Sequence, residues 1–243
     1  PQNAKHASGR IGGGADRLAG SAKNRFHFFG VGFHFGNLEI NRELHVLDAL
    51  IAGELFQEFA ERVNKGTGGA ITIRVFPAEQ LGKEVDLFKQ VKEGALDLSA
   101  PSMAAASSLV PALEIPSAPF LWKDWNEAEA LIRSDAFDPV FDELRDKHNI
   151  VPVSRIWYWG WRNMTTLDRA VKKPEDLQGL KIRVPESPVW VEMIKAYGAA
   201  PTPVPFGEVY TALQQKTVDG QENPIPTIFS RKFYEVQGFV AMT

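Results

Sequence analysis

The apolar residues between positions 43 and 102 change repeatedly from the spacing of strands to the spacing of helices. "AITIRVFP" alternates apolar and polar residues and stops at Pro77, as a strand does. "KEVDLFKQVKEG" instead places Val85, Phe88 and Val91 on one helical face, before a glycine that ends the helix. In order, the pattern predicts a strand at 43–47, a helix at 50–69, a strand at 70–77, a helix at 83–94 and a strand at 96–102. This β-α-β-α-β order is typical of a parallel sheet covered by helices.

The second half of the chain repeats the same plan. The pattern predicts a strand at 180–187, a helix at 189–198, an extended segment at 200–206, a helix at 207–217 and an extended segment at 218–224. Four residues of the first half match four of the second at one constant offset: Phe88, Val91, Leu96 and Asp97 correspond to Tyr210, Leu213, Val218 and Asp219. Two similar lobes explain this match, although any helix followed by a strand would produce a similar pattern.

The segment between the two halves contains a proline-rich loop, helical segments at about 126–147 and an apolar run at 150–158. We interpret that run as a strand that crosses between the lobes. Residues 1–40 are rich in Gly, Ala and Asn and show no clear period, which indicates an atypical or disordered leader. The expected organisation is therefore this leader, then lobe I at 41–159 including the crossover strand, then lobe II at 160–243.

The ends of the predicted strands indicate where a ligand should bind. In open parallel α/β sheets, ligands lie beyond the carboxyl ends of the strands, and two facing lobes bring these ends around one cleft. Arg183 stands just before the proline that stops its strand, and its guanidinium can pair bidentately with a carboxylate. Arg162 offers a second cation, and Asn223 offers a neutral donor and acceptor. Phe206 and Trp161 are candidates to shield the ion pair from water.

Each of these residues also has an ordinary structural explanation. An arginine near a strand end is most often a solvated or surface-paired residue. Trp157 and Trp161 belong to an aromatic run that is more often core or hinge packing than ligand contact. Asn223 stands before Pro224, where asparagine is a common turn residue. The pattern alone therefore leaves Arg183 as one candidate among several.

Composition excludes several classes of function. The 243 residues carry a net charge of −3, which provides no broad basic surface for nucleic acid. The chain has no cysteine, which excludes disulfides, thiolate catalysis and cysteine-ligated metals. No stretch is long and apolar enough to span a membrane, and no signal peptide is recognisable.

Catalytic motifs are also missing from the sequence. The histidines form no HxH or HExxH pattern, and neither GxSxG nor GxxxxGK[ST] occurs. Glu58, Glu61 and Glu84 stand on predicted helix faces, where we expect solvated surface. We therefore expect no cofactor, no metal ion and no enzyme activity, although two acids that the fold brings together would keep an enzyme as an alternative.

Several stretches carry a family resemblance. "RNMTTLDRAVKKPEDLQGLKIRVPES", "GAAPTPVPFGEVYTALQQKTVDGQENP" and "KFYEVQGFVAMT" together closely resemble the solute-binding proteins of TRAP transporters, the tripartite ATP-independent periplasmic family. "RVFPAEQLGKEVDLFKQVKEGALDLS" resembles the first lobe of the same DctP-type family. The likeness covers residues 44–243, and "PEDLQGLKIRVP" together with "VDGQENP" is highly specific.

The resemblance implies a periplasmic receptor with a two-lobed α/β fold of the type II-like kind. Such a receptor closes on a small organic acid and delivers it to TRAP membrane permease subunits driven by a sodium gradient. By match to the family pattern, Arg183 would clamp the ligand carboxylate, with Arg162 as a second anion contact. Asn223 would bond the same carboxylate, and Phe206 would line the pocket.

The resemblance does not identify the substrate. Glu186 and Ser102 stand at positions whose ligand contacts vary within the family. Sialic-acid binders resemble this chain strongly from Gly198 onwards, but they carry glutamate where Ser102 stands here, which weakens a sialate assignment. Sialic acid and dicarboxylates both remain candidates, as organic acids in general do.

Two further expectations follow from the resemblance. Family members continue beyond Thr243 with segments that close the second lobe, so we expect the chain as given to be less stable than a full-length member and to bind weakly or not at all. A ligand-sensing domain of a signalling system, built on the same fold, is the alternative to a transport receptor. The neighbouring genes would separate the two, since a permease pair favours transport and a kinase favours sensing.

Overall fold

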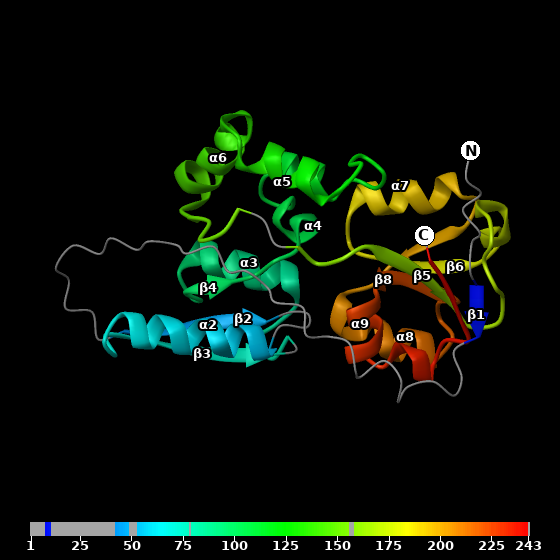
Figure 1. Ribbon diagram of the computed structural model, residues 1–243, viewed down its shortest axis with the longest axis horizontal. Coiled ribbons are helices and arrows are strands. Elements are labelled where there is room, and N and C mark those ends of the chain that lie inside the picture. Colours follow the sequence, from blue (N-terminus) through cyan, green and yellow to red (C-terminus); the bar gives the residue numbers. More distant parts are fainter. Residues whose placement is uncertain (1–7, 11–41, 49–52, 78, 156–157, 243) are drawn as a thin grey trace.

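The computed structural model places two α/β lobes side by side (Figure 1). The residues that it describes are 8–10, 42–48, 53–77, 79–155 and 158–242. Most of the predicted leader at 1–40 lies outside these residues, as does Trp157. The exception in the leader is β1 (Ser8–Arg10), which pairs antiparallel with β9 (Phe239–Ala241). No strand was expected at 8–10, because this strand forms by pairing with β9, which is distant in the sequence, and not from a local pattern.

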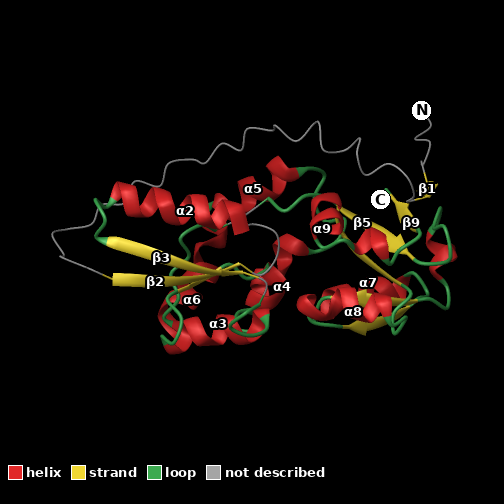
Figure 2. Cartoon of the chain, turned by 90° about the horizontal axis from the view of Figure 1, so that it is seen from below, coloured by secondary structure: helices red, strands yellow, loops and turns green. Residues whose placement is uncertain are grey.

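Lobe I is built on a three-stranded parallel sheet in the order β3-β2-β4. Its elements along the chain are β2 (Arg42–Asp48), α2 (Gly53–Gly66), β3 (Ile71–Pro77), α3 (Glu84–Glu93) and β4 (Leu98–Ser99). Figure 2 shows α2 on one side of this sheet and α3 on the other. The predicted β-α-β-α-β order is therefore confirmed.

The amphipathic spacing of the helices explains how lobe I packs. Phe56 of α2 is buried with Ile73 of β3, while Phe88 of α3 faces a second cluster formed with the later helices. Those helices are α4 (Met103–Ala106), the 3₁₀ helix η1 (Pro111–Ser117), α5 (Trp125–Arg133) and α6 (Asp138–His148). Gly94 ends α3 with a φ of 73°, which glycine adopts without strain. The helical region predicted at about 126–147 is confirmed by α5 and α6.

Lobe II contains a six-stranded mixed sheet in the order β1-β9-β5-β8-β6-β7. Its remaining strands are β5 (Arg162–Thr166), β6 (Lys181–Val184), β7 (Ala200–Pro203) and β8 (Gly220–Pro224). β6 runs parallel to both β7 and β8, as the sequence predicts. β5 runs antiparallel to β8 and β9, and this half of the sheet was not anticipated.

Helices cover both faces of the lobe II sheet. Figure 1 shows α7 (Pro188–Ala196) on one face and α8 (Val209–Gln214) with α9 (Ile225–Ser230) on the other. Ile182 and Val184 of β6 are fully buried in the cluster that includes the α7 residues. Because side chains alternate along a strand, the residue between them points to the opposite face. That residue is the arginine that precedes the proline stop.

The predicted crossover strand at 150–158 is wrong for the residues that the structure describes. Residues 150–155 and Tyr158 have no strand pairing, and the first strand of lobe II begins at Arg162. The apolar run resembled a strand, but Pro152 lacks a backbone donor and the segment links the lobes without a neighbouring strand. Extended chain, and not sheet, connects the lobes in this part.

Candidate ligand-binding site

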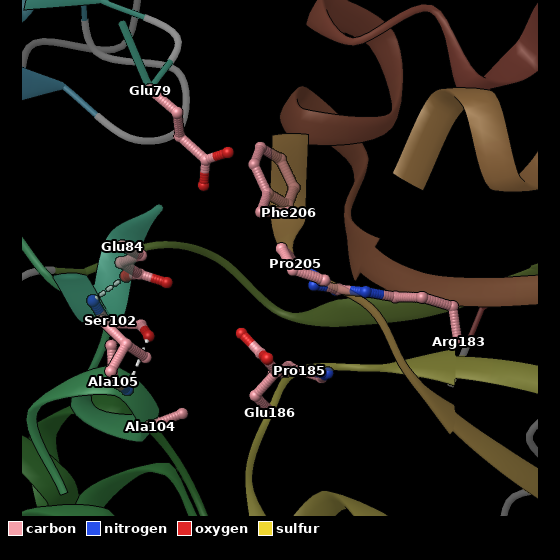
Figure 3. A pocket seen from close by; sticks show the side chains of 11 residues that line it. Glu79, Glu84, Ser102, Ala104, Ala105, Arg183, Pro185, Glu186, Pro205 and Phe206 are labelled. Carbon is pink, nitrogen blue, oxygen red and sulfur yellow. Dashed lines mark hydrogen bonds between the residues drawn. The ribbon is translucent and has the colours of Figure 1, made fainter. Parts of the chain in front are cut away.

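A pocket lies between the lobes, where the strands of both sheets end (Figure 3). Lobe I contributes residues that follow β3 and β4, and lobe II contributes residues that follow β6 and β7. Four of the predicted contacts line this pocket, namely Arg183, Phe206, Glu186 and Ser102. This pocket lies where the rule that ligands bind beyond the carboxyl ends of parallel strands predicts a site.

Arg183 is the buried cation of the pocket. Its side chain is 3% exposed, and its Nε donates to the carbonyl oxygen of Val204 at 2.9 Å. Burial lowers the pKa of Arg183 to about 10, and the attraction of the Glu222 carboxylate opposes this shift, so the guanidinium stays charged at neutral pH. Among the described residues, none forms a salt bridge with Arg183. A desolvated charge in this situation favours an anionic partner.

Phe206 fixes one wall of the pocket next to this charge. It stands in the 3₁₀ helix η4 (Phe206–Glu208), directly after the extended segment that contains β7. The Cζ of Arg183 lies 5.9 Å from the centroid of the Phe206 ring, and that of Arg231 lies 4.7 Å from it. Phe233 contacts the same ring edge-on, with centroids 6.4 Å apart. The ring therefore lies between cations and apolar core, which holds it in place beside the pocket.

Two glutamates of lobe I form the opposite wall. Figure 3 shows the side chains of Glu79 and Glu84 reaching into the pocket from the side that faces Arg183. Glu79 Oε2 accepts the backbone N–H of Gly207 at 3.0 Å, and Glu84 Oε1 accepts the backbone N–H of Ser102. Burial raises the pKa of both carboxyl groups, and each backbone hydrogen bond lowers it in part.

The expectation that Glu84 is solvated surface is wrong. It lies in the first turn of α3, where acids are common on exposed faces, but this turn is directed at the loop after β4. Glu58, in contrast, is exposed on α2 as expected. Ser102 explains the difference, because its hydroxyl caps α4 by accepting from Ala105 N at 3.1 Å while its own N–H bonds Glu84.

Three predicted contacts do not line the pocket. Arg162 is paired bidentately with Glu222, with Nη2 at 3.0 Å from Oε1 and at 2.9 Å from the Glu222 carbonyl oxygen. Asn223 is buried on β8 and donates to Gln221 Oε1 at 2.5 Å. Trp161 precedes β5 and is 57% exposed. None of the three is among the residues that line the pocket, and their contacts with a ligand stay predictions.

Sequence reasoning missed Glu79 as a pocket residue. It follows the end of β3 directly, so the strand-end rule that selected Ser102 would also have selected it. Glu222, the partner of Arg162, was also missed. It stands sixty residues further along the chain, and only the antiparallel pairing of β5 with β8 brings the two together.

Direct contacts between side chains also join the two lobes. Ser187, at the start of α7, donates its hydroxyl to Glu114 of η1, and both side chains are buried. Lys83 and Glu208 form an exposed ion pair of 2.7 Å across the rim. Ala104 of α4 packs into the core cluster of lobe II. The lobes therefore meet through polar contacts and through the apolar contact of Ala104, which also lines the pocket.

The burial of Glu114 predicts that the free energy of unfolding of the protein depends on pH. Burial raises the pKa of Glu114, so the folded protein binds this proton more tightly than the unfolded chain. Stability from this group therefore increases as the pH falls through the folded-state pKa, and the gain is complete below the unfolded-state pKa. Glu114→Gln should remove this gain. Urea unfolding of both proteins from neutral to mildly acidic pH measures it, and parallel pH profiles would contradict the assignment.

The described ranges contain neither a candidate metal cluster nor a candidate membrane span. Within them, no group of three or more His, Asp or Glu side chains is placed to hold a metal ion. No helix in the same ranges is both long and apolar enough to cross a membrane.

The fold and the pocket define a class of protein. Two α/β lobes with a ligand pocket at their facing strand ends are the architecture of two-lobed periplasmic binding proteins. Residues 48–243 match the family described as bacterial extracellular solute-binding protein, family 7, also called DctP, and the chain belongs to this family.

Individual relatives agree with this assignment. The sialic acid-binding periplasmic protein SiaP of Vibrio cholerae is 38% identical over 184 residues, which are 76% of this chain and 57% of SiaP. The chain thus spans little more than half of that relative's length.

Solved structures show the same fold. The sugar acid-binding protein DctPAm from Advenella mimigardefordensis, in complex with galactonate, has a TM-score of 0.77 at 30% identity over 83% of this chain and 69% of that one. A TRAP periplasmic solute-binding protein from Sulfurospirillum deleyianum with bound succinate has a TM-score of 0.74 at 30% identity, with the same coverage. These relatives are binding proteins, which favours the receptor prediction over the signalling and enzyme alternatives.

Proposed function

We propose that this chain is the ligand-capturing part of a TRAP receptor. It binds a small organic acid between its lobes in the periplasm and passes the acid to membrane permease subunits that use a sodium gradient. The observation that carries this proposal is Arg183, a buried guanidinium at the pocket wall with no salt bridge to any described residue. Family membership and the acid-binding relatives support the same function.

In this mechanism the ligand carboxylate pairs with the guanidinium of Arg183. The ring of Phe206 and the facing lobe exclude water, which strengthens the ion pair because the local dielectric is low. Closure of the lobes is favoured only by contacts that are better in the closed state. Glu186 and Ser102 supply such contacts, because they belong to different lobes and line the same pocket.

The other predicted residues do not line the pocket around Arg183. The carboxylate of Glu222 attracts Arg183 but is held by Arg162, so it does not occupy the position of a ligand. Asn223 and Trp161 flank this pair on β8 and before β5. We keep Arg162 as a second anion contact, Asn223 as a further hydrogen-bonding partner of the carboxylate and Trp161 as a ligand contact, each as a proposal.

A comparison of acids with their amides tests the proposed function. We expect organic acids to raise the melting temperature of the protein, while the neutral amides of the same acids do not. The physical reason is that only the acid supplies an anion for the buried cation. A thermal-shift series over short-chain hydroxy acids, dicarboxylates and their amides measures this. Equal stabilisation by acids and amides would reject a carboxylate receptor.

A further inference from the structure

One buried contact between the lobes involves no residue that lines the ligand pocket. Ser187 stands at the start of α7 in lobe II and donates its hydroxyl to Glu114 of η1 in lobe I. Glu114 is 8% exposed and Ser187 is 3% exposed, so both side chains are removed from water. Neither residue belongs to the pocket lining. The contact therefore depends on the position of the two lobes and not on a direct contact with the ligand.

The hydroxyl of Ser187 has an alternative partner within its own lobe. Ser187 is the N-cap residue of α7, a position at which a serine side chain commonly accepts a backbone N–H of the first turn. No side-chain cap hydrogen bond is present at the start of α7, and the hydroxyl is directed to lobe I instead. If the lobes separate, the same hydroxyl can cap α7. Ser187 therefore has one partner for the closed lobes and another for the open lobes.

The carboxyl group of Glu114 has no such alternative. Among the described residues, Ser187 provides the hydrogen bond of this side chain. Burial raises the pKa of Glu114, and no other cause contributes to the shift. A neutral carboxyl group keeps the contact, because it can accept from the hydroxyl or donate to it. A carboxylate in the same place is desolvated and has one neutral donor, so it is the less favourable form.

The elements around Glu114 supply no cation that would compensate a buried carboxylate. Glu114 is the only charged residue of η1, and α4, which packs against η1, has none. The other charged residues of the neighbouring segments are all exposed: Lys123 and Asp124 after η1, Glu186 before α7, and Glu192 and Lys195 on α7. Glu192 and Lys195 pair with each other at 2.8 Å. The dipole of α7 favours the ionised form at its start, and burial opposes it.

The two states of the lobes therefore differ in how tightly they bind a proton. Opening returns Glu114 to water, where its pKa is that of an ordinary glutamate, and closing buries it and raises its pKa. Because the closed form binds the proton more tightly, the proton in turn favours closure. This contribution grows as the pH falls through the closed-state pKa, and it is complete below the open-state pKa.

We propose that Glu114 and Ser187 form a latch between the lobes, and that the latch takes up a proton when the receptor closes on its ligand. The receptor then holds its acid more tightly under mildly acidic conditions and releases it more readily at neutral pH. This proposal rests on the proposed function, because it assumes that the bound acid draws the lobes together.

Calorimetry in two buffers of different ionisation enthalpy measures the protons taken up for each ligand bound. The probe is galactonate, the ligand of the Advenella relative, or the hydroxy acid with the largest thermal shift if galactonate does not bind. Between about pH 7.5 and pH 5.5 such an acid stays ionised and contributes no proton change of its own.

We expect the wild type to take up more protons on binding than Glu114→Gln. Glutamine keeps the shape of the side chain and its hydrogen bond to Ser187, but it does not titrate. As the pH falls, the affinity of the wild type should rise relative to that of the variant, by at most about tenfold per pH unit. Glu79 and Glu84 also have raised pKa values, so the difference between the two proteins is the quantity that counts.

Two further variants complete the experiment. The control is Glu192→Gln, which removes the same charge from an exposed position of α7 and should take up as many protons as the wild type. Ser187→Ala leaves Glu114 to be buried without its donor. In this variant the uptake should begin at a higher pH, while the affinity at neutral pH falls. Ser187→Ala therefore tests the latch even if Glu114→Gln does not fold.

The outcomes separate the latch from the proposed function. Equal proton uptake by the wild type and a folded Glu114→Gln protein overturns the latch, and so does a Ser187→Ala protein with unchanged uptake and affinity. In both cases the receptor function stands, because the acid still binds. If no acid of the thermal-shift series binds, the proposed function is rejected and the latch with it.

Discussion

Replacing Arg183 by alanine is expected to reduce the affinity for the acid ligand by about 2–5 kcal/mol. The ligand carboxylate would enter a desolvated site and find no charged partner there, while the glutamates of the opposite wall would remain. Arg183→Lys should also weaken binding, because an ammonium group cannot form the planar two-bond contact. Calorimetry with any acid that stabilises the wild type measures both losses.

The stability of the ligand-free protein provides the control for this experiment. Arg183 is a buried charge without a salt bridge to any described residue, so its removal relieves a desolvation cost while it leaves the Val204 carbonyl without one donor. We therefore expect only a small change in the melting temperature. Arg133→Ala, on the exposed face of α5, should change neither binding nor fold. Near-wild-type affinity of a folded Arg183→Ala protein would refute the role of Arg183.

Replacing Arg162 by alanine is expected to lower the free energy of unfolding by about 3 kcal/mol. Glu222 is 4% exposed, and the substitution would leave its carboxylate buried without the bidentate partner on β5. The expected loss is at the lower end of the range for broken buried pairs, because the Arg162 side chain is itself 27% exposed. Ligand affinity should fall as well, since Glu222 would then compete for Arg183.

Substitutions of both members of the ion pair distinguish the loss of the pair from a general packing defect. Glu222→Gln should cost less than Arg162→Ala, because the guanidinium can still reach water. Arg162→Met combined with Glu222→Gln should recover most of the stability lost in Arg162→Ala. Urea unfolding of the three proteins measures the differences. If the combination is as unstable as Arg162→Ala alone, the charge pairing is not the cause.

Local patterns explain which parts of the fold were predictable. The alternation in β6 and the proline after it selected Arg183, which lines the pocket, since both depend only on neighbouring residues. The strand-end rule also selected Ser102 and Phe206, which line it as well, because parallel strands end at one edge of a sheet. Arg162 and Asn223 came from the same reasoning, but they do not line the pocket and are bonded to Glu222 and Gln221, so their ligand contacts stay predictions.

The features that were missed depend on residues far apart in the chain. The antiparallel half of the second sheet requires pairing of β5 with β8 and β9, which no local period reports. Glu84 looked solvated because its partner, the backbone N–H of Ser102, lies eighteen residues later. The run at 150–158 was interpreted as a strand from its apolar composition, which is a local property. A strand also needs a neighbouring strand to pair with, and the composition of the run does not show whether one is present.

A crystal structure of the protein with a bound hydroxy acid tests the central claim most directly. We expect the ligand carboxylate to lie within about 2.7–2.9 Å of the Arg183 guanidinium nitrogens, as charge-assisted hydrogen bonds do. The rest of the ligand should lie between the lobes, against the lobe I residues that line the same pocket. A ligand bound outside the pocket, or with its carboxylate directed away from Arg183, would contradict the account.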